Sequence, residues 1–271
     1  MIELFDQQIR TIDRHSSKGN QLKWENNGIW YKADYMGYEG LAEYIVSHLL
    51  EYSTLKRDEY VIYDLDQIKY KRQIFNGVKS LNMLSQDWQI ITVERLFFNR
   101  YGKSFYESIW KIKDVKSRLE FLVDSVIKMT GLEGFGVYIE KLLTLDALFK
   151  NEDRHMHNIA VLMNGKGEFD LCPIFDNGAS LLSDYKMDYP LTEDIYDLME
   201  EAKAKTVSQS FDEQLDIAEQ LYGVNVRFNF NKKIVDELLE NTSIYSDREI
   251  ERVREFLYQQ MRKYKYLFIN N

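Results

Sequence analysis

The spacing of hydrophobic residues is strand-like at the start of the chain. Residues 21–24 and 29–33 are short apolar-rich runs, separated by a turn that contains Asn27-Gly28. Asn and Gly tolerate positive φ, so Asn-Gly between two such runs predicts a β-hairpin. Alternate side chains of a strand point to opposite faces, which places Tyr31 and Lys32 on different sides of the second strand.

One helix and two further strands complete the first third of the chain. Residues 39–52 carry apolar side chains at intervals of three and four, which predicts a helix. Residues 60–65 and 88–94 read as strands. The second of these runs is almost continuously apolar, as is typical of a central strand.

After residue 98 the pattern becomes mainly helical, interrupted by a predicted hairpin of residues 159–163 and 169–175. Gly131 stands where a helix C-cap is expected, and Ser246 with Glu249 fits a capping box. The predicted helices cover residues 118–130, 135–150, 193–205, 211–222, 232–240 and 247–264. This order predicts an α+β fold with a small β-rich N-terminal lobe, residues 1–95, and a larger helical C-terminal lobe, residues 96–271.

Composition narrows the class of protein. The chain has 271 residues, of which 45% are hydrophobic, enough for a sizeable core. Its 44 acidic and 35 basic residues give a net charge of −9, which disfavours general binding to nucleic acid. The single cysteine, Cys172, excludes an internal disulfide and a cysteine-based zinc site. The sequence has no membrane-length apolar run and no signal-peptide pattern at its start, so we expect a cytoplasmic protein without membrane contact.

The most informative segment is the polar stretch of residues 151–158, together with the motif Asp176-Asn177-Gly178 at the end of an apolar run. Asp153 and Asn158 are five residues apart, which is the interval between the Asp and the Asn of the protein-kinase catalytic loop. Phosphoryl transfer needs a carboxylate at the attacking hydroxyl and oxygen ligands for Mg²⁺. Asp153, Asn158 and Asp176 supply these three groups.

A lysine and a glutamate upstream fit the same chemistry. Lys32 lies on the second strand of the predicted hairpin, where a kinase places its phosphate-binding lysine. Its expected partner is a glutamate on the next helix. Glu39 and Glu43 are both candidates, and we favour Glu43 because it lies deeper in the helix. A metal site of Asp153, His155 and His157 is a competing interpretation of the polar stretch.

These segments, in this order, resemble the HipA-like serine/threonine kinases. Ser16-x-x-Gly19-x-Gln21-x-Lys23 is similar to their phosphate loop, and Tyr31-Lys32 to the following strand. Residues 92–97 are similar to the hinge segment, and residues 151–158 with 175–178 to the catalytic and metal-binding loops.

The resemblance implies a two-lobed, protein-kinase-like fold that binds ATP and Mg²⁺. It implies catalytic roles for Asp153, Lys32 and Glu43, and Mg²⁺ ligation by Asn158 and Asp176. The residues that it assigns to ATP binding are Ser16, Ser17, Gly19, Gln21, Lys23, Lys32, Glu94, Arg95 and Leu96. Ser16 stands where family members phosphorylate themselves.

The predicted function is therefore ATP- and Mg²⁺-dependent transfer of a phosphoryl group to Ser or Thr of a protein. A toxin–antitoxin role, with an antitoxin-like partner, follows from the same resemblance. The string Asp-Arg-His-x-x-Asn at residues 153–158 also resembles phosphoinositide kinases. A lipid or small-molecule kinase therefore stays open, as does a nucleotide-binding regulatory pseudokinase.

Overall fold

The computed structural model describes residues 1–10 and 21–269, which form two compact units. The first unit contains residues 1–83, 175–202 and 227–271, and the second contains residues 84–174 and 203–226. Both units mix strands and helices, so the predicted α+β class is confirmed. The two units follow from the packing of the chain. The lobe boundary expected at residue 95 stays a prediction.

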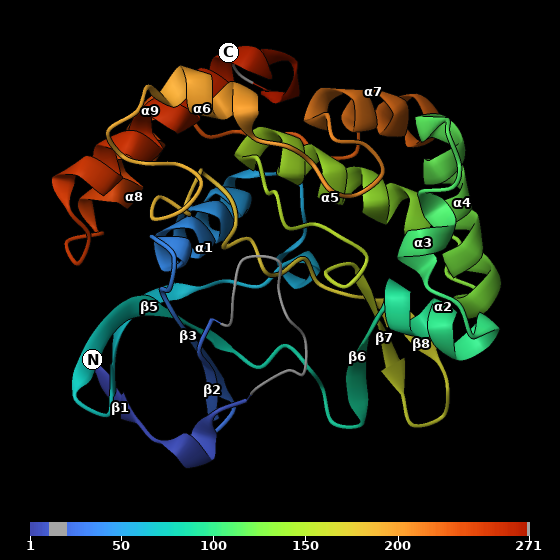
Figure 1. Ribbon diagram of the computed structural model, residues 1–271, viewed down its shortest axis with the longest axis horizontal. Helices are drawn as coiled ribbons and strands as arrows, with labels where there is room; N and C mark the ends of the chain where they lie inside the picture. Colours follow the sequence, from blue (N-terminus) through green and yellow to red (C-terminus); the bar gives the residue numbers. More distant parts are fainter. Residues whose placement is uncertain (11–20, 270–271) are drawn as a thin grey trace. The chain divides into compact units, whose positions relative to one another are not determined.

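A curved five-stranded sheet forms the base of the first unit (Figure 1). Its strand order is β1-β4-β5-β3-β2, with β1 parallel to β4 and the other neighbours antiparallel. The strands are β1 (Ile2–Leu4), β2 (Lys23–Asn26), β3 (Ile29–Ala33), β4 (Asp64–Tyr70) and β5 (Gln73–Leu81).

The predicted hairpin is present as β2 and β3. Asn27 and Gly28 form its two-residue loop with φ of 53° and 79°, the left-handed values that this short connection needs. Tyr31 packs into a buried apolar cluster on one face of the sheet. Lys32 is on the opposite face, as the alternation of the strand predicts.

Two strands of this sheet are absent from the sequence prediction, and one begins late. β1 and β5 are not predicted, and the strand expected at residues 60–65 begins only at Asp64. Within β5, Gly77 breaks the usual strand composition. A Cβ at Gly77 would lie 2.1 Å from the carbonyl oxygen of Lys32, so the close approach of β3 explains the glycine.

Among its described residues, the first unit has four α-helices: α1 (Glu39–Leu49), α6 (Ile195–Glu201), α8 (Lys232–Glu240) and α9 (Asp247–Lys263). α1 packs against β3, β4 and β5, and α8 packs against α9 (Figure 1). The predicted capping box of Ser246 and Glu249 begins α9. Short 3₁₀ turns are η1 (Asp6–Gln8), η2 (Leu50–Tyr52), η3 (Arg57–Glu59) and η4 (Lys265–Leu267).

The second unit combines a three-stranded sheet with five helices. Its strands are β6 (Trp88–Thr92), β7 (Ala160–Asn164) and β8 (Phe169–Leu171), in that order. Its helices are α2 (Val93–Tyr101), α3 (Phe105–Ile109), α4 (Val115–Thr130), α5 (Phe135–Phe149) and α7 (Phe211–Tyr222).

The strand predicted at residues 88–94 is present as β6, but its expected central position is wrong. β6 is an edge strand of this sheet, and α2 begins directly after it. β6 pairs with β7 on one side only and lies next to the helix that follows it. The predicted C-cap at Gly131 is confirmed, with a φ of 76° at the end of α4.

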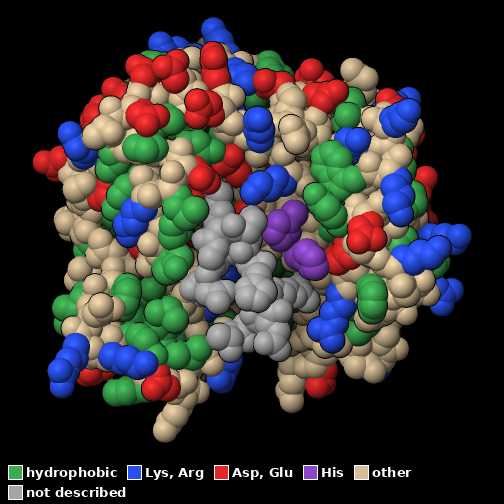
Figure 2. Space-filling model, viewed as in Figure 1, with side chains coloured by type: hydrophobic (Ala, Val, Ile, Leu, Met, Phe, Trp, Pro, Cys, Tyr) green, Lys and Arg blue, Asp and Glu red, His purple; other side chains and the backbone are tan. Residues whose placement is uncertain are grey.

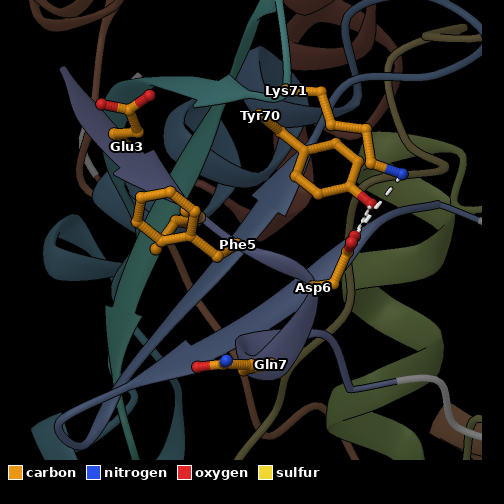
Figure 3. Close-up of a pocket in the computed structure, with 7 residues that line it drawn as sticks. Glu3, Phe5, Asp6, Gln7, Tyr70 and Lys71 are labelled. Atoms are coloured by element: carbon orange, nitrogen blue, oxygen red, sulfur yellow. Dashed lines mark hydrogen bonds and ion pairs between the residues drawn. The ribbon is translucent and has the colours of Figure 1, made fainter.

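A pocket of about 480 Å³ opens at the β1 edge of the first unit (Figure 3). It is lined by Glu3, Leu4, Phe5, Asp6, Gln7, Tyr70 and Lys71. The Tyr70 hydroxyl donates to the Asp6 carboxylate, and the Lys71 ammonium lies 3.5 Å from the same group. No residue of the predicted site lines this pocket.

Charged side chains of both signs cover the face shown in Figure 2, and acidic side chains gather over α6 and α9. Basic side chains on this face are interspersed among acidic ones. None of the described helices combines the length and the apolar character needed to cross a membrane.

Candidate active site

Lys32 and Glu43 form a buried ion pair in the first unit. The Lys32 Nζ lies 2.5 Å from Oε1 of Glu43, and the two residues are 8% and 1% exposed. β3 directs Lys32 to the face that α1 covers, and Glu43 lies one turn inside α1. Of the two glutamates considered from the sequence, the structure therefore places Glu43 beside Lys32.

Glu39 binds backbone groups at the start of α1 instead. Its carboxylate accepts hydrogen bonds from the backbone N–H groups of Tyr35, Met36 and Gly37 at 2.6–3.1 Å. These bonds close the loop between β3 and α1. A carboxylate here also faces the positive end of the helix dipole, which stabilises the first turn.

Asp176 completes a cluster with Lys32 and Glu43. The Asp176 Oδ1 lies 2.7 Å from the Lys32 Nζ, and its Oδ2 lies 3.7 Å from the Nζ of Lys23 on β2. Asp176 has a φ of 61°, a left-handed conformation that costs free energy and that aspartate tolerates better than most residues. The next residue, Asn177, donates its backbone N–H to the second oxygen of Glu43 at 2.9 Å.

The cluster keeps Lys32 charged. Burial alone would lower the pKa of Lys32, but the carboxylates of Asp176 and Glu43 outweigh burial and hold this pKa well above its usual value. The ring of Tyr63 lies 4.8 Å from the Lys32 Nζ and adds a cation–π contact. Burial, with the Glu43 charge as a second cause, raises the pKa of Tyr63, which therefore stays neutral. Sequence reasoning missed both Tyr63 and the Asn177 backbone group.

Asp153 and Asn158 meet in the second unit. The amide of Asn158 donates to the backbone oxygen of Asp153 at 2.7 Å and to its carboxylate Oδ2 at 3.1 Å. The Asp153 backbone N–H donates to Asn151 Oδ1 at 3.2 Å. The loop begins where α5 ends, at a left-handed Lys150 with a φ of 49°. The spacing that predicted a joint role for Asp153 and Asn158 therefore brings them into contact.

A buried ion pair that the sequence did not reveal supports this loop. Arg154 is 1% exposed, and its Nε lies 3.2 Å from both carboxylate oxygens of Asp146 on α5. The Arg154 backbone oxygen accepts the hydroxyl of Thr206 at 2.6 Å. These contacts fix the residue that directly follows Asp153.

His155 also faces Asp153. Its Nδ1 accepts the backbone N–H of His157 at 3.2 Å, so the neutral ring carries its proton on Nε2, which lies 3.6 Å from Asp153 Oδ1. Burial lowers the pKa of His155 below its usual value, although the Asp153 charge opposes this shift. Within residues 1–10 and 21–269, no three His, Cys, Asp or Glu side chains are grouped to hold a metal ion. The described residues therefore give no support to the competing metal-site interpretation of Asp153, His155 and His157.

Glu94, Arg95 and Leu96, the predicted adenine-contacting residues, lie in the first turn of α2 and not in a strand. Thr92 ends β6 and caps the helix, since its hydroxyl oxygen accepts the Arg95 N–H at 3.3 Å. The Glu94 carboxylate accepts two backbone N–H groups at the start of α3, at 2.9 and 3.1 Å. Contact of this segment with adenine stays a prediction.

The predicted phosphate loop is described only in part. Ser16, Ser17 and Gly19 lie outside the described residues. Gln21 precedes β2 and is partly exposed, and Lys23 on β2 joins the Asp176 cluster. Of the residues assigned to ATP binding, the structure therefore brings Lys23 and Lys32 to the same carboxylate.

Solved structures of other proteins resemble this fold. No family model and no curated protein matches the sequence. The proinflammatory kinase CtkA of Helicobacter pylori matches with a TM-score of 0.61, over 97% of this chain and 95% of that one. The chain has a kinase fold. At 17% identity, this likeness establishes the fold alone.

The second match is HipA of Shewanella oneidensis MR-1, solved with HipB and operator DNA. It has a TM-score of 0.48 and 13% identity, over 95% of this chain and 66% of that one. The kinase-like fold expected from the sequence is confirmed by the likeness to CtkA.

Proposed function

We propose that this protein is a kinase that uses ATP and Mg²⁺ to phosphorylate Ser or Thr residues of a protein. The observation that carries the proposal is the Lys32 ammonium held by Glu43 and Asp176 in a kinase fold. A buried lysine fixed by two carboxylates is a preorganised cation for phosphate oxygens. A regulatory pseudokinase has no need of a complete set of catalytic groups, whereas this chain carries a residue for each role that the proposed mechanism requires.

The two side chains proposed as Mg²⁺ ligands carry suitable donor atoms. Asp176 offers a carboxylate and Asn158 an amide oxygen, the hard oxygen ligands that Mg²⁺ prefers. The Asn158 amide N–H groups already face Asp153, which leaves the oxygen of the amide for a cation. When bound, Mg²⁺ neutralises charge on the phosphate oxygens. Asp176 would then exchange its contact with Lys32 for the cation, and Lys32 would be available to phosphate.

Asp153 would orient the acceptor hydroxyl and take its proton. A carboxylate that receives a hydrogen bond from Asn158 is fixed in direction and still accepts a proton. Neutral His155 and the buried Arg154–Asp146 pair hold the loop around it. The phosphate-loop and hinge residues named from the sequence would contact the rest of ATP.

The test is transfer of labelled γ-phosphate from ATP with Mg²⁺ to three acceptors: the chain itself, dephosphorylated casein, and phosphatidylinositol vesicles. We expect label on Ser or Thr with wild type and none with Asp153→Asn. Label on the lipid alone would show that the acceptor is a lipid and not a protein. Absence of transfer to every acceptor, with ATP bound, would favour the pseudokinase.

Several finer roles stay predictions of the sequence. They are self-phosphorylation at Ser16, a toxin role with an antitoxin-like partner, and a cytoplasmic location. Peptide mapping of wild type and Asp153→Asn after incubation with ATP and Mg²⁺ tests the first. Phosphate at Ser16 in wild type only is the expected result.

A further inference from the structure

A second carboxylate lies close to the Lys32–Glu43 pair and takes no part in it. Asp34 directly follows β3 and is mostly buried where the first turn of α1 meets the segment between α8 and α9. Its Oδ1 accepts the backbone N–H of Gly40 at 2.6 Å, and its Oδ2 accepts the hydroxyl of Tyr245 at 2.9 Å. One side chain thus joins a strand, a helix and a distant part of the sequence.

The first turn of α1 is packed closely at this point. A Cβ on Gly40 would lie 2.8 Å from Asp34 Oδ1, 2.8 Å from the Tyr245 hydroxyl and 2.9 Å from the Cα of Gly77. No side chain fits there, so the helix backbone rests directly on the sheet and on Tyr245. A substitution that frees Asp34 or Tyr245 removes the contacts that hold this turn.

The segment that carries Tyr245 is itself tied to the sheet. Asn76 on β5 donates its side-chain amide to the backbone oxygen of Ile244 at 2.7 Å. The Asn76 backbone oxygen accepts the N–H of Asp34 at 2.8 Å. The hydroxyl of Tyr245 is therefore held in place from both sides of its contact with Asp34.

Glu43 follows Gly40 by three residues and so lies one turn further along a similar face of α1. Its two carboxylate oxygens engage Lys32 and the Asn177 backbone at 2.5 and 2.9 Å. A helix moves largely as a rigid element. A shift of its first turn therefore changes the distance between Glu43 and Lys32.

We propose that Asp34 and Tyr245 are positioning residues that hold the first turn of α1 and thereby set the Lys32–Glu43 ion pair. This inference rests on the proposed kinase function for its kinetic part and on the geometry alone for its structural part. We call Asp34, Gly40 and Tyr245 the Asp34 clamp. Because Tyr245 lies between α8 and α9, the clamp makes the position of Lys32 relative to Glu43 depend on this helical pair.

The surroundings of Asp34 make the clamp sensitive to pH. The groups that face it are Glu39 of α1, Glu249 of α9, Tyr185 and Tyr245. Burial, with the Glu39 charge as a second cause, raises the pKa of Asp34 to about 7. Protonation turns one accepting oxygen of Asp34 into a hydroxyl, so the hydrogen bonds of the clamp change as the pH falls through this range.

The structural test is amide hydrogen exchange of α1 in the full chain. Tyr245→Phe removes one hydroxyl and should increase exchange of the first-turn amides by about 10-fold, as the loss of one hydrogen bond predicts. The matched control is Tyr258→Phe. It removes a hydroxyl that donates to Asp236 at 2.7 Å, a hydrogen bond between α9 and α8. Equal exchange of α1 in the two variants would overturn the clamp.

The kinetic test asks whether Tyr245 acts through Glu43. Tyr245→Phe should lower kcat/KM for ATP by about 10-fold, and should lower it by less than about two-fold when Glu43→Gln is already present. Multiplicative losses would mean that Tyr245 acts independently of Glu43 and would overturn the proposal. Asp34→Asn should mimic the protonated state and flatten the pH profile of kcat/KM near pH 7.

The exchange and kinetic results separate this inference from the proposed function. Faster α1 exchange in Tyr245→Phe, together with a wild type that transfers no phosphate, keeps the clamp and rejects the kinase. If wild type transfers phosphate and Tyr245→Phe leaves the exchange of α1 unchanged, the kinase function stands and the clamp is rejected.

Discussion

The Lys32 cluster and the Asp153 loop hold their key side chains by different means. Lys32 is fixed by opposite charges, with Glu43 and Asp176 at 2.5 and 2.7 Å. Asp153 is fixed by neutral groups, since its backbone N–H donates to Asn151 Oδ1 and its carboxylate accepts the Asn158 amide N–H. The difference matches what each region would have to do, since phosphate binding needs a preorganised cation and hydroxyl activation needs a carboxylate that can still accept a proton.

Their supports differ as well. The Lys32 cluster depends on the position of one helix, α1, which the Asp34 clamp holds. The Asp153 loop is instead attached to the core by the buried Arg154–Asp146 pair. Substitutions in the first region should therefore alter nucleotide binding, and those in the second should alter transfer or the stability of the loop.

The largest effect should come from Asp153→Asn. The asparagine keeps the shape of the side chain and removes its basicity, so kcat should fall by about 10³-fold or more, at the upper end of general-base effects. Binding of ATP should stay near normal, because the carboxylate acts on the acceptor. Rapid-quench transfer and equilibrium ATP binding measure the two quantities. A variant that keeps most of its activity would show that another group takes the proton.

Arg154→Met should be the most destabilising change at the loop. It leaves Asp146 buried without its charge partner, which costs about 3–5 kcal/mol of unfolding free energy. The matched control is Arg254→Met, which breaks the more exposed Arg254–Asp236 pair and should cost about 1 kcal/mol or less. Urea denaturation of both variants gives the comparison, and similar losses would contradict a supporting role for Arg154.

Lys32→Met should lower kcat/KM for ATP by about 10²–10³-fold, the usual loss for one preorganised electrostatic group. Most of the loss should appear in nucleotide binding, in contrast to Asp153→Asn. Lys79→Met is the matched control, because Lys79 lies on β5 of the same sheet and forms a half-exposed pair with Asp66 at 3.4 Å. Unchanged ATP affinity in Lys32→Met would separate this lysine from the phosphates.

The smallest effect concerns the pH dependence of stability. Asp34 has a pKa of about 7 in the folded chain, above its usual value of 3.8, so the folded state binds this proton more tightly than the unfolded state. Its contribution to stability is present at low pH and is lost as the pH rises toward 7. Asp34→Asn should remove this dependence.

The difference in unfolding free energy between wild type and Asp34→Asn should change by about 1–2 kcal/mol from pH 5 to pH 7.5. This change is smaller than the value obtained from about 1.36 kcal/mol for each unit of pKa difference, because Asp34 keeps some contact with solvent. Denaturant titrations at four pH values measure it. A constant difference across the range would mean that Asp34 does not titrate there.

The parts of the site that local patterns control were predictable. The Asn27-Gly28 turn and the alternation of β3 place Lys32 on one face, and the helical spacing of α1 places Glu43 deeper than Glu39. The five-residue interval likewise brings Asn158 to Asp153. In each case residues close in sequence share one element or one loop.

The remaining features depend on packing between distant segments. β5 contains a glycine that strand propensity disfavours, and only its contact with β3 explains Gly77. The sequence predicts a strand that extends to residue 94 because the apolar run continues past Thr92. In the structure this threonine instead caps α2. The Arg154–Asp146 and Tyr245–Asp34 contacts have no signature in the local sequence.

Titration calorimetry of ATP, with and without Mg²⁺, on wild type and Asp176→Asn tests the central claim most directly. Asp176 joins Lys32 and Lys23 at the proposed nucleotide site. The account predicts that wild type binds ATP more tightly with Mg²⁺ and that Asp176→Asn loses this Mg²⁺ dependence while still folding. No heat of binding at millimolar ATP with Mg²⁺, or an unchanged Mg²⁺ effect in Asp176→Asn, would contradict it.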